Sequence, residues 1–324
     1  MKGMEPESVH CCITSPPYFG LRDYGNEKQI GLEETPDEYV AKMVKVFRSV
    51  WRVLRDDGTL WLVLGDSYAG SGPCGASYRS KTTIAREGQT QDGVFRISKT
   101  LAERGLTYAD KKPIPPKGYK PKDLMGIPWR VALALQADGW YLRSDIIWHK
   151  SNPMPESVKD RPTKSHEYIF LLTKQKKYYY DHEVIKEEAV SGHSKSGSTF
   201  KRTGSKREQA IPGHSKGTHR PDRLETSYNG STRNKRDVWT VATQPYKGAH
   251  FAVFPQKLIE PCVLAGCPES GIVFDPFCGA GTAGLVALGN GRNFIGIELN
   301  ADYIELAHER IAKVVQEYNI LKTD

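Results

Sequence analysis

A strand, a glycine-rich turn and the start of a helix follow one another near the end of this chain, and this succession constrains the fold more than any other feature. Residues 271–277 (GIVFDPF) are apolar enough for a strand that is covered on both faces. The turn at 278–282 (CGAGT) leads into residues 283–291 (AGLVALGNG), which are typical of a helix that ends at glycine. This order predicts a doubly wound α/β sheet that binds a nucleotide-like ligand at the carboxyl end of the strand.

Strands and helices alternate along most of the remaining chain. Apolar runs predict strands at residues 9–14, 59–66, 140–150, 167–174 and 292–299, and helical spacing predicts helices at residues 36–55, 128–139, 255–266 and 301–318. Because the strands alternate with helices, we expect an α/β fold with one doubly wound, mostly parallel, Rossmann-like sheet. Residues 67–122 are rich in Gly, Ser, Lys and Pro, which is typical of a long loop inserted into such a sheet.

The positive charge of the chain is concentrated in two blocks. The whole chain of 324 residues has a net charge of +8, and residues 191–236 alone carry +8, with 11 Lys and Arg against three acids. Residues 77–122 carry a further +7, so the rest of the chain is acidic. Concentrated positive charge favours phosphate contacts with nucleic acid, since such contacts release counterions. The alternative interpretation is that both blocks are solvated loops.

The cysteine and histidine patterns exclude several classes of protein. The six Cys residues form no Cys-x-x-Cys pair and the nine His residues are irregularly spaced, so we expect reduced thiols and no metal site. No apolar run is long enough to span a membrane, and the first ten residues lack the apolar core of a secretory signal. Together these features predict a soluble cytoplasmic protein that does not associate with membranes.

The glycine-rich turn has the features of a nucleoside site rather than a phosphate site. No Gly-Lys-Ser or Gly-Lys-Thr follows it, so it is not a phosphate-binding P-loop. Glu298 ends the next predicted strand, where a carboxylate can accept hydrogen bonds from both ribose hydroxyls. Asp275 would repel a phosphate group, which favours a neutral or cationic nucleoside over a dinucleotide. A purely structural turn is the alternative.

A second motif, Ser15-Pro16-Pro17-Tyr18, directly follows the strand predicted at residues 9–14. Two prolines fix a rigid turn and remove two N–H donors, so the Ser15 hydroxyl oxygen and the Pro16 carbonyl make an acceptor-rich pocket. Such a pocket suits an NH₂ group, whose hydrogens require acceptors. Tyr18 offers a flat face on which a base rotated out of a duplex can stack. A tight structural turn with a packed tyrosine is the alternative.

The motifs, taken in this order, resemble those of amino-directed DNA methyltransferases that use S-adenosylmethionine, in the circularly permuted beta-type group whose catalytic motif comes first. TSPPY resembles the catalytic motif, GIVFDPFCGAGT the cofactor motif, IGIE (295–298) the acidic strand end and HFAVFP (250–255) the segment that covers the methionine part of the cofactor. The resemblance covers most of the chain outside the two basic blocks. It implies a methyltransferase sheet that is circularly permuted and carries basic loop insertions.

The resemblance also implies roles for individual residues. The cofactor would be bound by Asp275, Pro276, Phe277, Gly279, Gly281, Thr282, Glu298, Phe251 and Pro255. The target base would be held by Ser15, Pro16, Pro17 and Tyr18. The variable segment that reads the DNA would contribute Lys201, Arg202, Lys206, Arg207, Arg233, Lys235 and Arg236.

The domain organisation follows from the same resemblance. Residues 1–182 would form the catalytic part, with the insertion at about 67–122, and residues 237–324 the cofactor-binding part of the same domain. Residues 183–236 would form the target-recognition segment between them, and residues 152–168 would line the substrate cleft. Members of the family usually have a further strand before the catalytic strand. Only eight residues precede it here, so we expect the sheet to lack that strand.

The resemblance favours transfer of a methyl group to cytosine N4 in double-stranded DNA, with adenine N6 as the alternative, because Ser-Pro-Pro-Tyr often accompanies cytosine and Asp-Pro-Pro-Tyr adenine. Methylation of cytosine C5 is excluded, since neither Pro73-Cys74 nor Pro261-Cys262 is followed by Gln. A protein-glutamine methyltransferase would have its cofactor motif first. A DNA-binding protein with a vestigial cofactor pocket remains the alternative of another class. A homodimer and a cognate restriction nuclease as partner stay open.

Overall fold

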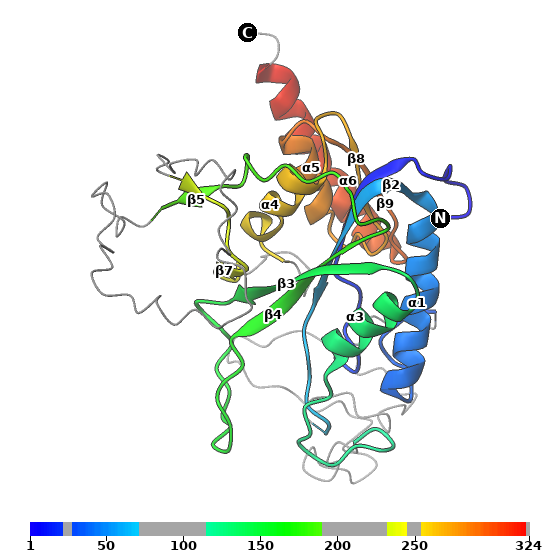
Figure 1. Cartoon of the computed structure of the whole chain (residues 1–324), viewed down its shortest axis with the longest axis vertical. Helices are drawn as coiled ribbons and strands as arrows, with labels where there is room; N and C mark the ends of the chain where they lie inside the picture. Colours follow the sequence, from blue (N-terminus) through cyan, green and yellow to red (C-terminus); the bar gives the residue numbers. More distant parts are fainter. Residues whose placement is uncertain (22–27, 71–114, 190–231, 245–253, 322–324) are drawn as a thin grey trace, which may run out of the picture. The chain divides into compact units, whose positions relative to one another are not determined.

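The computed structural model describes residues 1–21, 28–70, 115–189, 232–244 and 254–321 (Figure 1). The chain divides into two compact units, one of Met1–Asp181 with Arg236–Asp324 and one of His182–Lys235. The larger unit contains a seven-stranded sheet. The smaller unit contains β5 (Glu187–Glu188) and β6 (Thr232–Arg233), which pair antiparallel with each other.

The central sheet is mostly parallel, as the sequence predicts. Its strands are β1 (Val9–Thr14), β2 (Leu54–Leu64), β3 (Tyr141–His149), β4 (His166–Thr173), β7 (Val238–Thr240), β8 (Ile272–Asp275) and β9 (Asn293–Gly296). They lie in the order β7-β3-β4-β2-β1-β8-β9. Only β4 runs antiparallel to its neighbours, which are β2 and β3. This confirms the predicted Rossmann-like α/β sheet, whereas the circular permutation stays a prediction.

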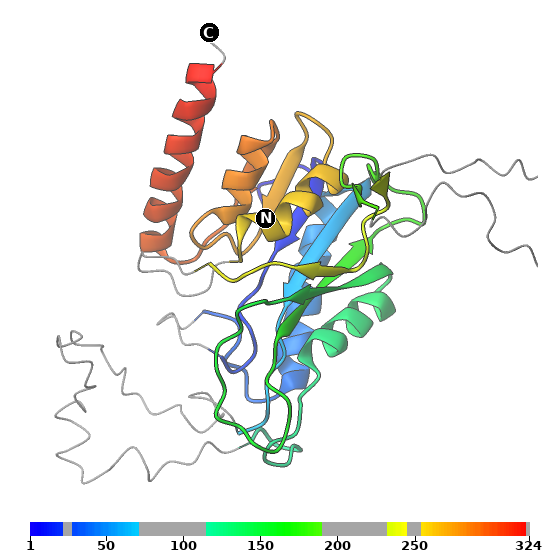
Figure 2. The same cartoon turned by 90° about the vertical axis from the view of Figure 1, so that its left-hand side faces the viewer.

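Helices cover both faces of the sheet (Figure 2). They are α1 (Pro36–Val53), α3 (Ile127–Ala137), α4 (Gln256–Gly266), α5 (Thr282–Gly289) and α6 (Ala301–Leu321). Helix α1 packs against α3, while α5 packs against both α4 and α6. Residues from β1, β2, α1 and α3 form one continuous apolar core, which explains why the run Leu60–Leu64 of β2 is apolar throughout.

The start of α1 follows the predicted capping pattern. Thr35 has extended backbone angles, its hydroxyl accepts a hydrogen bond from the backbone N–H of Glu38 at 3.2 Å, and Pro36 occupies the first turn. Tyr39, Met43 and Phe47 are fully buried at helical spacing. Packing of this face therefore supplies most of the stability of α1.

The end of α1 differs from the prediction. Helix α1 ends at Val53 and β2 begins at Leu54, so Asp56-Asp57-Gly58 lies within the strand instead of ending the helix. The pairing with β1 shifts from Val9 opposite Leu54 to Cys11 opposite Thr59, so the extra residues bulge from the ladder. The buried ammonium of Lys174 stabilises this bulge, because it lies 2.8 Å from Asp56 Oδ1 and donates to the Leu54 carbonyl at 3.0 Å.

Several short strands were not predicted. Strand β7 pairs parallel with β3, and β5 and β6 lie in a region that lacks apolar periodicity. Strands of two or three residues are too short to show an alternating pattern. Most of the predicted insertion, residues 71–114, lies outside the described residues, as do residues 190–231 of the second basic block.

The described cysteines are reduced and mostly buried. Cys11, Cys12, Cys262 and Cys267 are buried and Cys278 is partly buried, all as free thiols. Burial raises the pKa of the Cys267 and Cys278 thiols to about 12, so both stay protonated near neutral pH. None of the helices of the described chain has the length and apolar character that a bilayer-spanning segment needs.

Candidate active site at the carboxyl ends of the strands

The topology of the sheet brings both predicted motifs to one edge. Strands β1, β2, β8 and β9 run parallel, so their carboxyl ends meet there. Strand β3 also ends at this edge, and the antiparallel strand β4 begins there. The residues that follow or begin these strands are Ser15 after β1, Gly65 after β2, Lys150 after β3, Glu167 in β4, Asp275 at the end of β8 and Glu298 after β9. This is the edge at which doubly wound sheets bind their ligands.

A buried hydrogen bond joins the two motifs directly. Thr14, the residue before Ser15, donates its hydroxyl to Asp275 Oδ1 at 2.6 Å. The same oxygen accepts from the backbone N–H of Phe277 at 2.9 Å. Asp275 is 1% exposed, so it acts on the turn through these hydrogen bonds instead of presenting a free carboxylate.

The environment of Asp275 disfavours its charge. Burial raises the pKa of the Asp275 carboxyl to about 7, and the nearby charge of Glu298 acts in the same direction. The hydrogen bonds from Thr14 and Phe277 act against this shift. A carboxyl group held in this way titrates near neutral pH, where its charge is only partly offset by its two donors.

The glycine-rich turn favours glycine at two positions. Gly279 has φ of 51° and Gly281 has φ of 76°, both in the left-handed region that favours glycine. A Cβ atom at Gly281 would lie 3.0 Å from the Cβ of Ala307, so α6 packs directly on the turn. The remaining predicted cofactor residues of this segment, Pro276 and Thr282, are buried.

Glu298 caps the turns on either side of it. Its Oε2 accepts from the backbone N–H of Gly279 at 2.8 Å, and its Oε1 accepts from the N–H groups of Leu299 and Asn300 at 2.9 Å each. An ionised carboxylate offers about four acceptor positions, so Oε2 keeps capacity for a ligand hydroxyl. Glu298 thus lies beside the glycine-rich turn.

The Ser-Pro-Pro-Tyr turn is held by hydrogen bonds on its inner side. The Tyr39 hydroxyl of α1 donates to the Pro17 carbonyl at 2.9 Å. Ser15 Oγ donates to Tyr18 Oη at 3.4 Å. Ser15 and Tyr18 are partly buried and Pro16 is buried, so the turn forms the wall of the site and is not a mobile surface loop.

Two polar residues that the sequence analysis does not name individually complete this wall: Glu167, within the segment 152–168 predicted to line the substrate cleft, and Lys150, just before that segment. Tyr18 Oη donates to Glu167 Oε2 at 2.7 Å, and Lys150 Nζ forms an ion pair with the other oxygen of Glu167. Burial, together with the charge of Glu167, raises the pKa of the Tyr18 hydroxyl well above its usual range, so Tyr18 stays neutral. In the sequence, Glu167 is only an acidic residue at the start of an apolar strand, and this pattern does not indicate that Tyr18 and Lys150 are its partners.

The connection between β3 and β4 flanks the same edge. Arg161 forms an ion pair with Glu156 at 2.7 Å within this connection. The Lys164 ammonium donates to the carbonyl of Asp66, two residues after β2. Lys164, which belongs to the segment 152–168 predicted to line a substrate cleft, therefore lies beside the end of β2.

The other predicted site residues are placed as follows. Pro255 is the N-cap residue of α4, which packs against β1 and β2. In the smaller unit, Arg233 forms an ion pair with Glu187 at 2.9 Å. Lys235 is partly exposed and Arg236 is exposed. Phe251, Lys201, Arg202, Lys206 and Arg207 lie outside the described residues.

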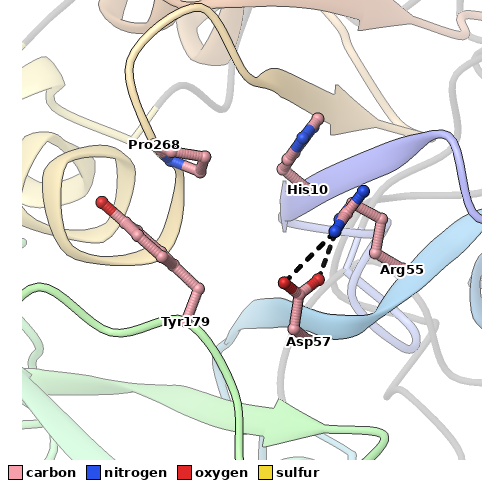
Figure 3. A pocket seen from close by; sticks show the side chains of 5 residues that line it. All are labelled: His10, Arg55, Asp57, Tyr179 and Pro268. Atoms are coloured by element: carbon pink, nitrogen blue, oxygen red, sulfur yellow. Dashed lines mark hydrogen bonds and ion pairs between the residues drawn. The ribbon is translucent and has the colours of Figure 1, made fainter.

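A small pocket lies at the opposite edge of the sheet and is separate from both motifs (Figure 3). It is lined by His10, Arg55, Asp57, Tyr179 and Pro268. Arg55 and Asp57 form an ion pair at 2.8 Å, and His10 Nδ1 accepts from the backbone N–H of Ile272 at 3.0 Å. The hydrogen bond between Ile272 and His10 joins the amino ends of β8 and β1, whereas the ion pair lies within β2. The described part of the chain contains no group of three His, Cys, Asp or Glu side chains that could hold a metal ion.

Comparison with known sequences identifies relatives along almost the whole chain. A DNA methylase family model, N6_N4_Mtase, matches residues 9–309, which include both turns. The Type II methyltransferase M.SmaI of Serratia marcescens is 45% identical over 97% of this chain and 87% of M.SmaI. The Type II methyltransferase M.Cfr9I of Citrobacter freundii is 45% identical over 94% of this chain and 81% of M.Cfr9I.

Two solved structures share the fold. The PvuII DNA methyltransferase, described as cytosine-N4-specific, aligns with a TM-score of 0.58 and 17% identity over 98% of this chain and 87% of its own. A DNA modification methylase of Thermus thermophilus, in complex with S-adenosyl-L-methionine, aligns with a TM-score of 0.55 and 19% identity over 97% of this chain and 89% of its own. At such identities the likeness concerns the arrangement of strands and helices.

Proposed function

Since this chain belongs to the DNA methylase family of N6- and N4-directed enzymes, we propose that it transfers a methyl group from S-adenosylmethionine to N4 of cytosine in duplex DNA. The observation that carries the proposal is the hydrogen bond of 2.6 Å between Thr14 and Asp275. It holds the acceptor-rich turn beside the glycine-rich turn, so an amine bound at the first lies next to a nucleoside bound at the second.

The residues at the glycine-rich turn fit S-adenosylmethionine. Glu298 Oε2 has acceptor capacity for one ribose hydroxyl beside its hydrogen bond from the Gly279 N–H. It can accept from the second ribose hydroxyl as well if that hydroxyl replaces the Gly279 N–H as its donor. The turn has no lysine to pair with a phosphate, which suits a nucleoside that carries none. When bound, this cofactor supplies an activated methyl group on a positively charged sulfur.

The Ser-Pro-Pro-Tyr turn accounts for the choice of an amine as target. The exocyclic amine of cytosine is a poor nucleophile, because its lone pair is delocalised into the ring. The Ser15 hydroxyl oxygen and the Pro16 carbonyl accept its two hydrogens and so keep electron density on nitrogen. Tyr18 provides an aromatic face for the base once it is rotated out of the duplex.

Ser15 also supports cytosine over adenine as the base. In the family that the motifs resemble, Ser-Pro-Pro-Tyr often accompanies cytosine N4 and Asp-Pro-Pro-Tyr often accompanies adenine N6. Ser15 is a neutral acceptor where the adenine-associated motif has a charged one. Adenine N6 is the second candidate, and it would use the same acceptors.

Nucleoside mass spectrometry of DNA from cells that express the chain tests this function. We expect N4-methylcytosine, and we expect much less of it from cells that express Ser15→Ala at the same level. N6-methyladenine without N4-methylcytosine would overturn the base assignment and keep the acceptor geometry. Neither modified nucleoside in DNA from wild-type cells would overturn the function itself.

Cofactor binding should depend on Glu298. Replacing Glu298 with alanine removes the acceptors for the ribose hydroxyls, so we expect binding of S-adenosylmethionine to weaken by roughly 1–3 kcal/mol. Isothermal titration calorimetry measures this directly. The matched control is Glu305→Ala, which removes an exposed carboxylate from α6 and should leave the affinity unchanged. Equal affinities of wild type and Glu298→Ala would rule out this role.

A further inference from the structure

The Ser15 hydroxyl begins a chain of hydrogen bonds that leads away from the amine-binding pocket. Ser15 Oγ donates to Tyr18 Oη at 3.4 Å, and Tyr18 Oη donates to Glu167 Oε2 at 2.7 Å. Lys150 Nζ pairs with the other carboxylate oxygen. We propose that Glu167, held by Lys150, fixes the direction of the Ser15 hydroxyl through Tyr18 and receives the proton that the methylated amine loses. This inference rests on the proposed methyl transfer, and it makes Glu167 and Lys150 positioning residues.

The direction of the chain follows from the number of hydrogens available. A phenol carries one hydrogen and an ionised carboxylate carries none, so the single hydrogen of Tyr18 is committed to Glu167. The Tyr18 oxygen therefore accepts, and the single hydrogen of Ser15 is committed to Tyr18. What Ser15 leaves for a ligand is its lone pairs, which is what the hydrogens of an amine need. Without the carboxylate, Tyr18 could donate to Ser15 and turn its hydrogen toward the amine.

Packing holds the side chains of Tyr18, Glu167 and Lys150 in place. The Lys150 and Glu167 side chains are 20% and 15% exposed, and the Lys150 ammonium also lies 4.6 Å from the centre of the Trp148 ring. A Cβ atom at Gly65 would lie 2.6 Å from Tyr18 Cε2 and 3.2 Å from Glu167 Cδ. The end of β2 thus has room for the contact between Tyr18 and Glu167 only because residue 65 is glycine.

The same chain gives the released proton a path. As the nitrogen of the amine forms its bond to the methyl carbon, the bond from that carbon to sulfur breaks and its electron pair stays on sulfur. The nitrogen then gives one hydrogen to Ser15 Oγ, Ser15 passes its own to Tyr18, and Tyr18 passes its own to Glu167. Ser15 and Tyr18 end neutral, and the positive charge that arose on nitrogen ends as a proton on the carboxylate.

Other ionisable groups face Glu167 and must be separated from it in any test. Lys164 lies two residues before β4, His166 is the first residue of β4, and Asp66 follows β2. Burial, and then the charge of Lys164, lowers the pKa of the His166 ring. A pH profile of the wild-type protein alone therefore reports on several groups, and the Glu167→Gln variant is needed to identify the contribution of Glu167.

The test is the single-turnover rate of methyl transfer to a duplex oligonucleotide by Tyr18→Phe, Glu167→Gln and the double variant. Tyr18→Phe keeps the ring for stacking and removes the hydroxyl, and Glu167→Gln keeps the shape and removes the charge. We expect each to slow transfer roughly tenfold with unchanged affinity for S-adenosylmethionine. The double variant should be no slower than the slower single variant, because both changes break one chain. The wild-type rate should fall toward acidic pH, and that fall should be weaker in Glu167→Gln.

The matched control is Asp57→Asn, which breaks the ion pair with Arg55 at the opposite edge of the sheet and should transfer at the wild-type rate (Figure 3). Wild-type rates in both single variants, or additive losses in the double variant, would overturn the hydrogen-bonded chain while leaving the methyltransferase function in place. An unaltered pH profile in Glu167→Gln would overturn the assignment of the proton. A wild-type chain that transfers no methyl group would instead overturn the proposed function.

Discussion

Replacing Ser15 with alanine should slow methyl transfer on the order of a hundredfold under single-turnover conditions, with no change in the affinity for S-adenosylmethionine. The hydroxyl oxygen accepts from the amine as charge develops on nitrogen, so its contribution is larger in the transition state than in the ground state. One preorganised hydrogen-bond partner of this kind contributes about 3 kcal/mol, which corresponds to about two orders of magnitude in rate. Cofactor affinity should be unchanged, since the glycine-rich turn and Glu298 are intact.

Rapid-quench transfer of a labelled methyl group, with enzyme in excess over a cognate duplex, gives this rate, and calorimetry gives the affinity. Ser8→Ala is the matched control, because it removes a serine hydroxyl that donates to the Glu5 carbonyl on the surface, away from both turns. It should transfer at the wild-type rate. A Ser15→Ala rate equal to the wild type would show that the hydroxyl takes no part in the chemical step.

The centre of the sheet could be predicted because β1 and the second half of β2 are apolar and buried. Strand β8 could be predicted because it is followed by a turn with left-handed glycines at two positions. The boundary between α1 and β2 could not be predicted. Asp56-Asp57-Gly58 has the composition of a turn, but the buried Lys174 lies far away in sequence and stabilises it as a bulge in the strand.

The candidate site also contains some residues that the sequence predicts and others that it does not. Ser15, Asp275 and Glu298 are visible in the sequence because each follows a strand end in a short motif, and parallel strand ends share one edge of a sheet. Glu167 lies in β4 and Lys150 directly follows β3, the antiparallel neighbour of β4. The contact of Glu167 with Tyr18, and that of Lys150 with Glu167, depend on the order of strands in the sheet, which sequence patterns do not specify. The same holds for Gly65, which reads as an ordinary turn glycine until Tyr18 is placed against it.

Affinity for duplex DNA should fall steeply with salt. Residues 191–236 carry a net charge of +8, and a protein that neutralises about six phosphates has a slope of log K against log salt near −5. Between 50 and 200 mM salt this corresponds to a loss of about a thousandfold in affinity. The physical reason is the release of condensed counterions, which is less favourable when the bulk salt concentration is high. Fluorescence anisotropy with a labelled duplex, measured at several salt concentrations, gives the slope.

Four basic residues of that segment, Lys201, Arg202, Lys206 and Arg207, should account for much of this slope. Their joint replacement with glutamine should make the slope shallower by about 3 to 4, because each phosphate contact contributes about one. The matched control replaces four exposed lysines outside both basic blocks, namely Lys2, Lys45, Lys257 and Lys313, and changes the net charge equally. It should leave the slope near the wild-type value, because the slope depends on the number of phosphates that basic residues contact and not on the overall charge of the protein. If affinity falls equally on cognate and unrelated duplexes, these residues contact phosphates and not bases. Equal slopes for the wild type and for the variant in which these four residues are replaced with glutamine would mean that this segment does not contact the DNA backbone.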